Sequence, residues 1–582
     1  MTHQKSLFNK NLFFEDLKQN KHIMILYTIF LLLATTLPAM IMYNSYLESR
    51  HFYMLSDVAE MLSMANPFVT IINTAAAVIF VILQFGYLYK TNSVIFYHSM
   101  PITRKNMLVT KFLAGFFAMI IPILFTFMVN LSLNVIIGFQ FWVSVANMFK
   151  IIAAVLLTTL FTYSVVMFAQ SFCSNVFALI IAVMFIFLLY PVTKVVAVGT
   201  FIAYMPTYYV NLTLPLADYF YPMWITFSKT GLLKIFTPSF AIYLVIMPII
   251  LVSLSAIIYS KRKSENTNKF FAFDIVNKFL KYYITICLGI GFGTLIRANV
   301  NSMNIIINFV VHTMAIVVIF SILQAIFEKN IKNMFANKKM MLLVIICILV
   351  FVTIVEVDIF KIDKMVPDAD KTNEIYIDMP VFSRNDYYYS SDELKFSERK
   401  SIEGAINLMK TGKISKDRYP SRDEKVVYLN FSTSKYQKWG IKRRIFVSNE
   451  EFDKFLELVF DTKEYKDQLY GFDNIYIPEN GKYGLHIAHV KGENVGSEYF
   501  YIRNEKEKTN LVINTLKEEA YSAKYSDIRG EKTTYFIECE YRKDEKNGGY
   551  RYNYRQIPVF ESFEKTNEVL DMFYNEHKEN IQ

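Results

Sequence analysis

The chain has 582 residues, of which 53% are hydrophobic and 19% are charged, and its formal net charge is +10. Lys and Arg outnumber Asp and Glu by 24 to 10 in residues 1–357, whereas residues 358–582 hold 37 against 41. This uneven distribution of charge excludes a single globular domain and indicates a membrane domain followed by a polar domain. The basic residues of the first part lie in short segments beside apolar runs, so they do not indicate nucleic-acid binding.

The cysteines exclude two further kinds of protein. Cys173, Cys287 and Cys347 lie in or beside apolar runs, and Cys539 is alone in the polar part. This pattern predicts neither an intrachain disulfide framework nor a zinc site. No cleavable signal peptide is predicted, because the first apolar run is followed by no small-residue cleavage pattern and is typical of a span.

Residues 6–20 mix apolar and charged side chains in an imperfect stripe. The stripe predicts an interfacial helix that leads into the first span, and a frayed cytosolic tail is the alternative. A spanning helix needs about 20 apolar residues. The sequence predicts nine such spans, near residues 22–43, 68–89, 112–135, 150–170, 174–194, 238–260, 282–299, 304–327 and 340–357.

The loops predict the orientation of these spans. If the N-terminus lies inside, the inner segments carry 18 Lys and Arg, and the outer segments of similar total length carry six. This is the bias expected of a positive-inside arrangement. We therefore expect a multi-pass plasma-membrane protein with a cytoplasmic N-terminus and an extracellular C-terminal domain.

The spans hold few ionisable side chains: His312 lies in the eighth, and Glu356 lies at the end of the ninth. The lack of intramembrane carboxylates argues against an ion-coupled transporter, and His312 is expected to be packed or pore-facing. Gly289 and Gly293 have the spacing of a G-x-x-x-G packing face. Residues 195–237 are expected to form the longest outer loop, either on the surface or dipping into the outer leaflet.

After residue 357, charged residues alternate with apolar ones, which indicates a solvated α+β domain rather than a disordered tail. Two segments each predict strand, hairpin turn, strand and helix, so an internal ββα repeat is expected. Ser448 and Glu451 form a capping box at the start of the first helix. The four expected strands contain residues 427–431, 443–447, 535–539 and 554–557.

The polar part offers no catalytic constellation. His486 and His489 are expected to be surface histidines, because a spacing of three on a strand points them to opposite faces. Asp386, Asp392 and Glu393 are read as a solvated face rather than a cation or sugar site. No G-x-S-x-G or H-E-x-x-H motif occurs, so an enzyme is not expected.

One short basic stretch between the second and third spans stands apart from the other loops. His98-Ser99-Met100-Pro101-Ile102-Thr103-Arg104 resembles the first inner loop of permease subunits of type-2 ATP-binding-cassette (ABC) exporters from low-GC Gram-positive bacteria. Two further matches follow in order, at residues 259–265 and from Glu356 to Pro367. They are similar to the subgroup with a large C-terminal outer domain, although Asn266-Thr267-Asn268 departs from the small residues expected there.

The resemblance implies the domain organisation and the partners. Residues 1–262 would form a six-span ABC permease core with an N-terminal interfacial helix, residues 263–357 three additional spans, and residues 358–582 an extracytoplasmic α+β domain. The core would pair with a second permease, identical or related, within membrane lipid. An inner loop would contact a separate ATPase through the coupling residues His98, Met100, Pro101, Ile102, Arg104 and Lys105.

The residues agree with one part of this expectation. The chain has no G-x-x-x-x-G-K-[ST] phosphate loop, so it holds no cofactor of its own, and ATP would be bound by the partner. Pro101 would fix the shape of the loop through its locked φ angle, and Arg104 would pair with acidic groups on the ATPase. The alternative function is a membrane-anchored sensor whose outer domain detects a cell-wall component or an antibiotic. The transported substrate stays open.

Overall fold

The computed structural model describes residues 8–49, 54–138, 144–205, 207, 216–222, 235–263, 269–300, 304–363, 365–378, 394–412, 423–433, 441–472, 485–490, 498–502, 506–529, 531–544 and 550–581. The chain forms two compact units. The first comprises Met1–Thr200 and Leu212–Val352, and the second comprises Phe201–Asn211 and Thr353–Gln582.

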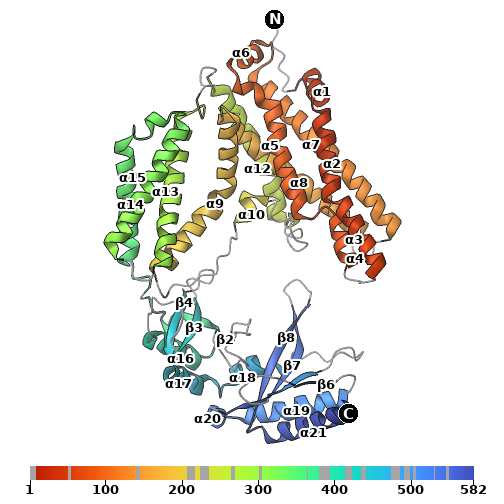
Figure 1. Ribbon diagram of the computed structural model, residues 1–582, viewed down its shortest axis with the longest axis vertical. Helices are drawn as coiled ribbons and strands as arrows, with labels where there is room; N and C mark the ends of the chain where they lie inside the picture. The colour runs from red at the N-terminus through yellow and green to blue at the C-terminus, as the bar shows by residue number, and fades with distance from the viewer. Residues whose placement is uncertain are drawn as a thin grey trace. The chain divides into compact units, whose positions relative to one another are not determined.

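The first unit is helical. Among the residues that the structure describes, nine helical stretches are long and apolar enough to cross a membrane, as the sequence predicts. The chain is therefore a polytopic helical membrane protein with a smaller strand-containing region toward its C-terminus. The helices are α2 (Lys21–Ala34) with α3 (Thr36–Ser49), α4 (Met54–Leu62) with α5 (Pro67–Phe85) and η1 (Gly86–Tyr89), α7 (Arg104–Ile137), α8 (Val145–Phe172), α9 (Val176–Tyr204), α12 (Pro238–Lys261), α13 (Asp274–Asn299), α14 (Ile305–Phe327) and α15 (Lys338–Glu356) (Figure 1).

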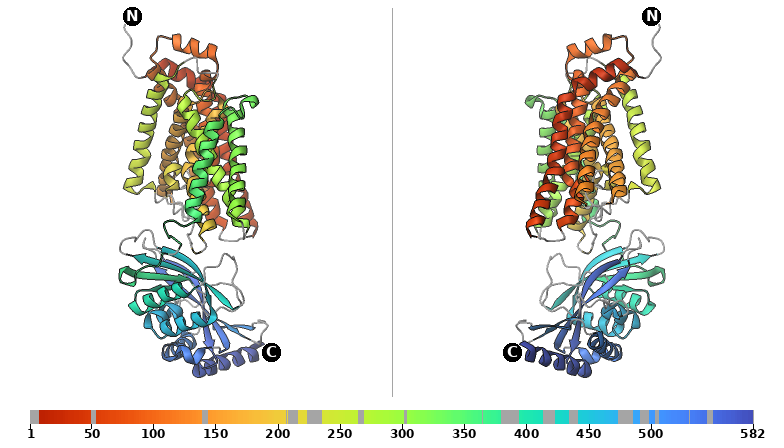
Figure 2. Two further views of the ribbon diagram at one scale, coloured as in Figure 1. Left: turned by 90° about the vertical axis from the view of Figure 1, so that its left-hand side faces the viewer. Right: turned by 90° about the vertical axis from the view of Figure 1, so that its right-hand side faces the viewer.

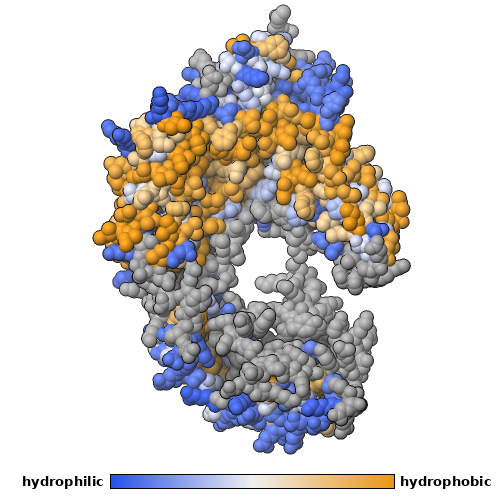
Figure 3. Space-filling model, in the orientation of Figure 1, coloured by the Kyte–Doolittle hydropathy of each residue, from blue (hydrophilic) through white to orange (hydrophobic). Residues whose placement is uncertain are grey.

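Two shorter helices lie across one end of this bundle, α1 (Lys10–Gln19) and α6 (Thr91–Ser99) (Figure 2). Hydrophobic side chains gather over the long helices, and hydrophilic side chains are mixed with hydrophobic ones at the end at which α1 and α6 lie (Figure 3). The predicted N-terminal helix is thus confirmed over residues 10–19.

The first span is interrupted for a local reason. Pro38 has no N–H to donate to the carbonyl of Ala34, so regular helical bonding fails between α2 and α3. Thr35 leaves the helical region with φ −123° and ψ −67°. Its hydroxyl donates to the carbonyl of Leu31 at 2.8 Å, which satisfies a carbonyl near the end of α2.

Helix α7 lies at the centre of the first unit and contacts α1, α2, α4, α5, α8 and α12. Gly115 permits the close approach of α8, because a Cβ atom there would lie 1.9 Å from the hydroxyl oxygen of Tyr163. Tyr163 is fully buried. A glycine is therefore required at this crossing.

Helices α13 and α14 pack through the predicted glycine face. Both Gly289 and Gly293 are directed at α14: a Cβ atom on Gly289 would lie 2.9 Å from Ile316, and one on Gly293 would lie 2.3 Å from the ring of His312. His312 is fully buried and its Nδ1 lies 2.9 Å from the carbonyl oxygen of Asn308. The expectation of a packed His312 is confirmed, and so is the packing face.

This contact gives a test with a control on the same helix. Gly293→Ala should lower the free energy of unfolding by about 1–3 kcal/mol, because the fully buried His312 ring must be displaced. Gly291→Ala should be neutral or slightly stabilising, since its Cβ would lie 3.4 Å from Val196, an ordinary contact. Thermal unfolding in detergent checks both, and equal midpoints for the two variants would contradict the packing argument.

Two predicted boundaries in the first unit were wrong. Residues 195–204, assigned to the outer loop, continue helix α9, which passes through Pro191 without ending. The seventh span begins at Asp274 rather than residue 282, so Lys278 and Lys281 lie within α13. Lys281 is buried there because its ammonium group donates to Gln324 Oε1 at 2.6 Å. Both predictions relied on apolar content alone, which does not locate the C-terminal end of α9 or the N-terminal end of α13.

The second unit contains two four-stranded antiparallel sheets with matching strand orders, β2-β1-β3-β4 and β6-β5-β7-β8. In each sheet the central pair joins two hairpins, and a helix follows each hairpin. The strands are β1 (Thr372–Asp378), β2 (Leu394–Phe396), β3 (Glu424–Thr433), β4 (Ile441–Ser448), β5 (Leu485–His489), β6 (Glu498–Ile502), β7 (Thr533–Asp544) and β8 (Tyr550–Phe560). The helices are α16 (Arg399–Thr411), α17 (Asn449–Val459), α19 (Lys506–Ser522) and α21 (Glu564–Ile581), with short α18 (Lys463–Tyr470) and α20 (Tyr525–Ile528) between them.

The predicted strand–strand–helix order is present in both halves, as β3-β4-α17 and β7-β8-α21. Ser448 caps α17 by accepting the N–H of Glu451 at 3.3 Å, as its capping-box pattern predicts. The full repeat is twice as long, because β1-β2-α16 and β5-β6-α19 precede these elements. The preceding hairpins were missed. The predicted turns at Trp439-Gly440 and Asn547-Gly548-Gly549 lie outside the described residues.

The candidate residues of the second unit have separate outcomes. His486 and His489 are both half-buried, and the ring centroids of Tyr535 and Tyr574 lie 4.8 and 4.7 Å from that of His489. His486 and His489 both lie on β5. Asp386, Asp392 and Glu393 lie outside the described residues.

Candidate functional site: a braced helix–turn–helix beside α1

The predicted coupling residues lie on two helices and a short turn. His98 is in the last turn of α6, and its side chain is outside the described part of the chain. Residues 100–103 connect α6 to α7. Arg104 and Lys105 begin α7, whose first turn is capped by the hydroxyl of Thr103 accepting the N–H of Asn106 at 3.2 Å. Three of the six predicted coupling residues are thus helical, and three lie in the turn between the helices.

The turn between these helices is centred on Pro101. The N–H of Ile102 donates to the carbonyl of Met100 at 2.7 Å, which closes a three-residue turn. Proline suits the central position because its ring fixes φ near the value that this turn requires. Pro101 and Lys105 are exposed, whereas Met100, Ile102 and Arg104 are half-buried. The turn therefore presents one edge outward and rests the other on the bundle.

Arg104 is engaged inside the chain. One of its guanidinium nitrogens donates to the carbonyl oxygens of Arg262 at 2.9 Å and Ser260 at 3.4 Å; Ser260 lies in the last turn of α12, and Arg262 directly follows the helix. The last carbonyls of a helix lack intrahelical partners and carry partial negative charge, so a guanidinium is a favourable cap. From the sequence, Arg104 is expected to pair with acidic groups of a partner. In the structure, Arg104 donates to backbone carbonyls at the end of α12.

Arg262 extends this connection to two more helices. It is 3% exposed, and its guanidinium donates to the carbonyl oxygens of Cys173 at 2.8 Å and Leu88 at 3.2 Å. Cys173 follows α8, and Leu88 lies in η1. Burial lowers the pKa of the Arg262 guanidinium from its usual high range. Two arginines thus join the start of α7 to the ends of α12, α8 and η1.

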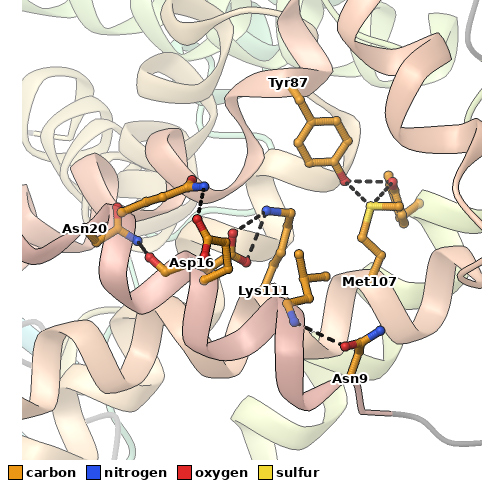
Figure 4. A network of polar contacts seen from close by, with 10 residues as sticks. Asn9, Asp16, Asn20, Tyr87, Met107 and Lys111 are labelled. Carbon is orange, nitrogen blue, oxygen red and sulfur yellow. Dashed lines mark hydrogen bonds and ion pairs between the residues drawn. The ribbon is translucent and has the colours of Figure 1, made fainter.

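Helix α1 is fastened to α7 by a buried ion pair. Lys111 Nζ lies 3.0 and 3.2 Å from the two carboxylate oxygens of Asp16, and the residues are 3% and 6% exposed (Figure 4). Burial is the largest influence on the pKa of Asp16 and raises it, whereas the nearby Lys111 acts in the opposite direction. Asn9 caps α1 by accepting the N–H of Leu12 at 3.1 Å, and its own N–H donates to Thr110 on α7 at 3.0 Å.

A tyrosine cluster connects the ion pair to α6. The rings of Tyr97 on α6 and Tyr87 in η1 stack at 4.3 Å. Lys111 Nζ lies 5.4 Å from the centroid of Tyr97 and 5.7 Å from that of Tyr87, which is within the range of a cation–π contact. The hydroxyls of Tyr87 and Tyr259 are 2.8 Å apart. Together these contacts fix α6 against α1, α7 and α12.

Helix α6 exposes two large apolar side chains. Ile95 and Phe96 are 59% and 62% exposed, and Pro101 and Lys105, which follow α6 in the chain, are exposed as well. We call Ile95, Phe96, Pro101 and Lys105 the α6 face. Within the described residues, no group of three or more His, Cys, Asp or Glu side chains is placed to hold a metal ion. What the site provides is an exposed contact surface with rigid connections to the long helices.

Sequence reasoning did not predict the buried contacts of this site, which are made by Asp16, Lys111 and Arg262. Asp16 is one of two acidic residues in an amphipathic stretch, and Lys111 precedes an apolar run, but neither pattern predicts that the two meet. Arg262 lies between Lys261 and Lys263, both exposed, so the sequence does not distinguish the buried member of the three. A search of protein-family models, of curated proteins and of solved structures finds no match to this chain.

Proposed function

We propose that this chain is the membrane-spanning permease subunit of an ABC exporter, driven by a separate ATP-binding subunit that docks on the α6 face. The observation that carries the proposal is the combination of the exposed α6 face with buried polar contacts that connect α7, α8, α12 and η1. A few residues near the centre of an interface, with aromatic side chains and arginine prominent among them, supply most of its affinity. The resemblance of residues 98–104 to the inner loop of such permeases points the same way.

The proposed mechanism is mechanical. The partner binds and hydrolyses ATP, and its closure pushes on α6 and the Pro101 turn. Arg104 and Arg262 carry the displacement to the ends of α12, α8 and η1, while Asp16 and Lys111 carry it to α1. The helices then rearrange, either within a pair of identical chains or beside a related permease, and a ligand moves across the lipid bilayer.

The test is co-purification of the tagged full-length protein from its native membranes in mild detergent, with partners identified by mass spectrometry. Phe96→Asp should reduce recovery of an ABC ATPase at least about fivefold, because a charge replaces a central apolar contact. Ile331→Asp is the matched control, since Ile331 is 77% exposed and lies in the α14–α15 connection. Recovery of intact protein without an ATPase would reject the proposal.

A second candidate function is a membrane-anchored sensor. The second unit favours it, because two matched four-stranded sheets form a separate folded body far larger than a loop. In that case the full-length protein would bind a wall component or antibiotic specifically, with no vectorial flux in reconstituted vesicles. Flux dependent on ATP and the partner would exclude this alternative.

A further inference from the structure

The second unit is not continuous in sequence, since it includes Phe201–Asn211 as well as the residues from Thr353 onward. Three of its chain segments meet at a polar cluster: the residues after α9, the residues after α15, and strand β4. We call Thr207, Asp358, Asp363, Arg443 and Arg444 the junction. All five belong to the second unit.

Thr207 uses each of its polar groups here, and it is 4% exposed. Its N–H donates to Asp363 Oδ1 at 2.9 Å, and its hydroxyl lies 2.6 Å from the same oxygen and 2.9 Å from the carbonyl oxygen of Asp363. Its carbonyl accepts the backbone N–H of Arg444 at 2.8 Å. Thr207 therefore bonds both to the segment after α15 and to the edge of β4.

The segment after α15 is held in a tight turn. Asp358 has φ +49°, a left-handed conformation that aspartate tolerates better than most residues. Its carboxylate accepts the N–H of Ile362 at 2.7 Å and the N–H of Asp363 at 3.0 Å. These two bonds offset the unfavourable backbone angle and place the Asp363 carboxylate where Thr207 meets it.

Arg443 closes the cluster from the sheet. It is 2% exposed, and its guanidinium donates to the carbonyl oxygens of Ile362 and, at 3.5 Å, of Met365. A buried arginine bonded to backbone carbonyls is costly to detach, because both the charge and the carbonyls would lose their partners. The sheet is thereby bound to the segment that follows α15.

The tethers are short. Thr207 lies three residues beyond the end of α9 at Tyr204, and Asp363 lies seven residues beyond the end of α15 at Glu356. Three residues span at most about 10 Å even when fully extended. A displacement of the last turn of α9 therefore reaches the junction with little slack.

We propose that the junction joins the last turn of α9, the segment after α15 and the sheet β2-β1-β3-β4 into one mechanical body, so that a movement of either helix end is passed to the sheet, and a movement of the sheet to both helices. The inference does not depend on an ATPase partner. It assigns Thr207, Asp363 and Arg443 as positioning residues that make the second unit responsive to α9 and α15.

Hydrogen exchange in the full-length protein in lipid nanodiscs tests this. Arg443→Met should raise amide exchange about tenfold or more in Phe201–Tyr204 as well as in residues 358–365. Arg399→Met is the control, because Arg399 lies in the same unit with a side chain that is 71% exposed. It should change neither segment. Faster exchange confined to residues 358–365 would overturn the proposal.

A second variant guards against a general loss of folding. Thr207→Val keeps the side-chain shape and removes only the hydroxyl bonds to Asp363. It should raise exchange in residues 358–365, across the junction from the substitution, while β5 and β7 stay protected. If Arg443→Met also raises exchange in β5 and β7, that variant is partly unfolded and the result for Thr207→Val decides. In Thr207→Val, faster exchange limited to Phe201–Tyr204 would refute the single-body arrangement.

Discussion

Asp16→Ala should lower the free energy of unfolding of the first unit by about 3–5 kcal/mol, the usual cost of leaving a buried charge without its partner. Lys111, which is 3% exposed in the intact chain, would lose the carboxylate that pairs with it and keep the Tyr87 and Tyr97 rings near its ammonium group. Thermal unfolding in detergent measures the loss. Protease cleavage between α1 and α2 should increase in parallel, because α1 loses its main anchor on α7.

Replacing both residues separates the net contribution of the ion pair from the cost of leaving one buried charge unpaired. Burial is the largest influence on the pKa of Asp16 and raises it, and the desolvation of a buried ion pair can offset the attraction between its charges, so the pair by itself is not expected to stabilise the fold. Asp16→Leu with Lys111→Met should therefore regain most of the lost stability. Asp274→Ala is the control, because Asp274 pairs with Lys269 at the same 3.0 Å but its side chain is 71% exposed. It should cost less than about 1 kcal/mol, and an equal cost would refute the role of burial.

Arg262→Met should be the second most damaging change. It leaves the buried carbonyls of Cys173 and Leu88 without a donor, at about 1–3 kcal/mol for each group. Arg262→Lys should recover only part of this loss, since one ammonium group replaces a fork that reaches two carbonyls at once. Thermal unfolding and, in the proposed complex, ATP-dependent transport are the measurements.

The neighbours of Arg262 provide the control. Lys261→Met and Lys263→Met remove the same charge one position away, from side chains that are exposed. Both variants should unfold at the wild-type temperature. If all three substitutions have equal effects, the net charge of the segment matters rather than the bonds to Cys173 and Leu88.

Sequence reasoning identified the elements whose signals are local. Apolar run length located the nine long helices, the Gly289 and Gly293 spacing identified a packing face, and the Ser448 cap marked the start of α17. It failed where a signal depends on a distant residue. The Asp16–Lys111 contact joins positions 95 apart, and Arg104 meets Arg262 across 158 positions, so no local pattern reveals either.

The missed hairpins have a different cause. Strand β2 has three residues, and β5 and β6 have five each, which is too few for alternation to stand out from a charged background. Strands β3, β4, β7 and β8, with eight to twelve residues each, were the ones found. The second half of the domain then follows the first in strand order, so recognising one half in full would have predicted the other.

The inclusion of Phe201–Asn211 in the second unit has a consequence for synthesis of the chain. Residues 212–352 must be translated before the remainder of that unit begins to emerge. At about 5–20 residues per second this takes roughly 7–30 seconds. During that time Thr207 has neither Asp363 nor β4 to bond with, so completion of the C-terminal fold waits on correct insertion of four later helices. The folded second unit therefore reports that the membrane part was inserted correctly.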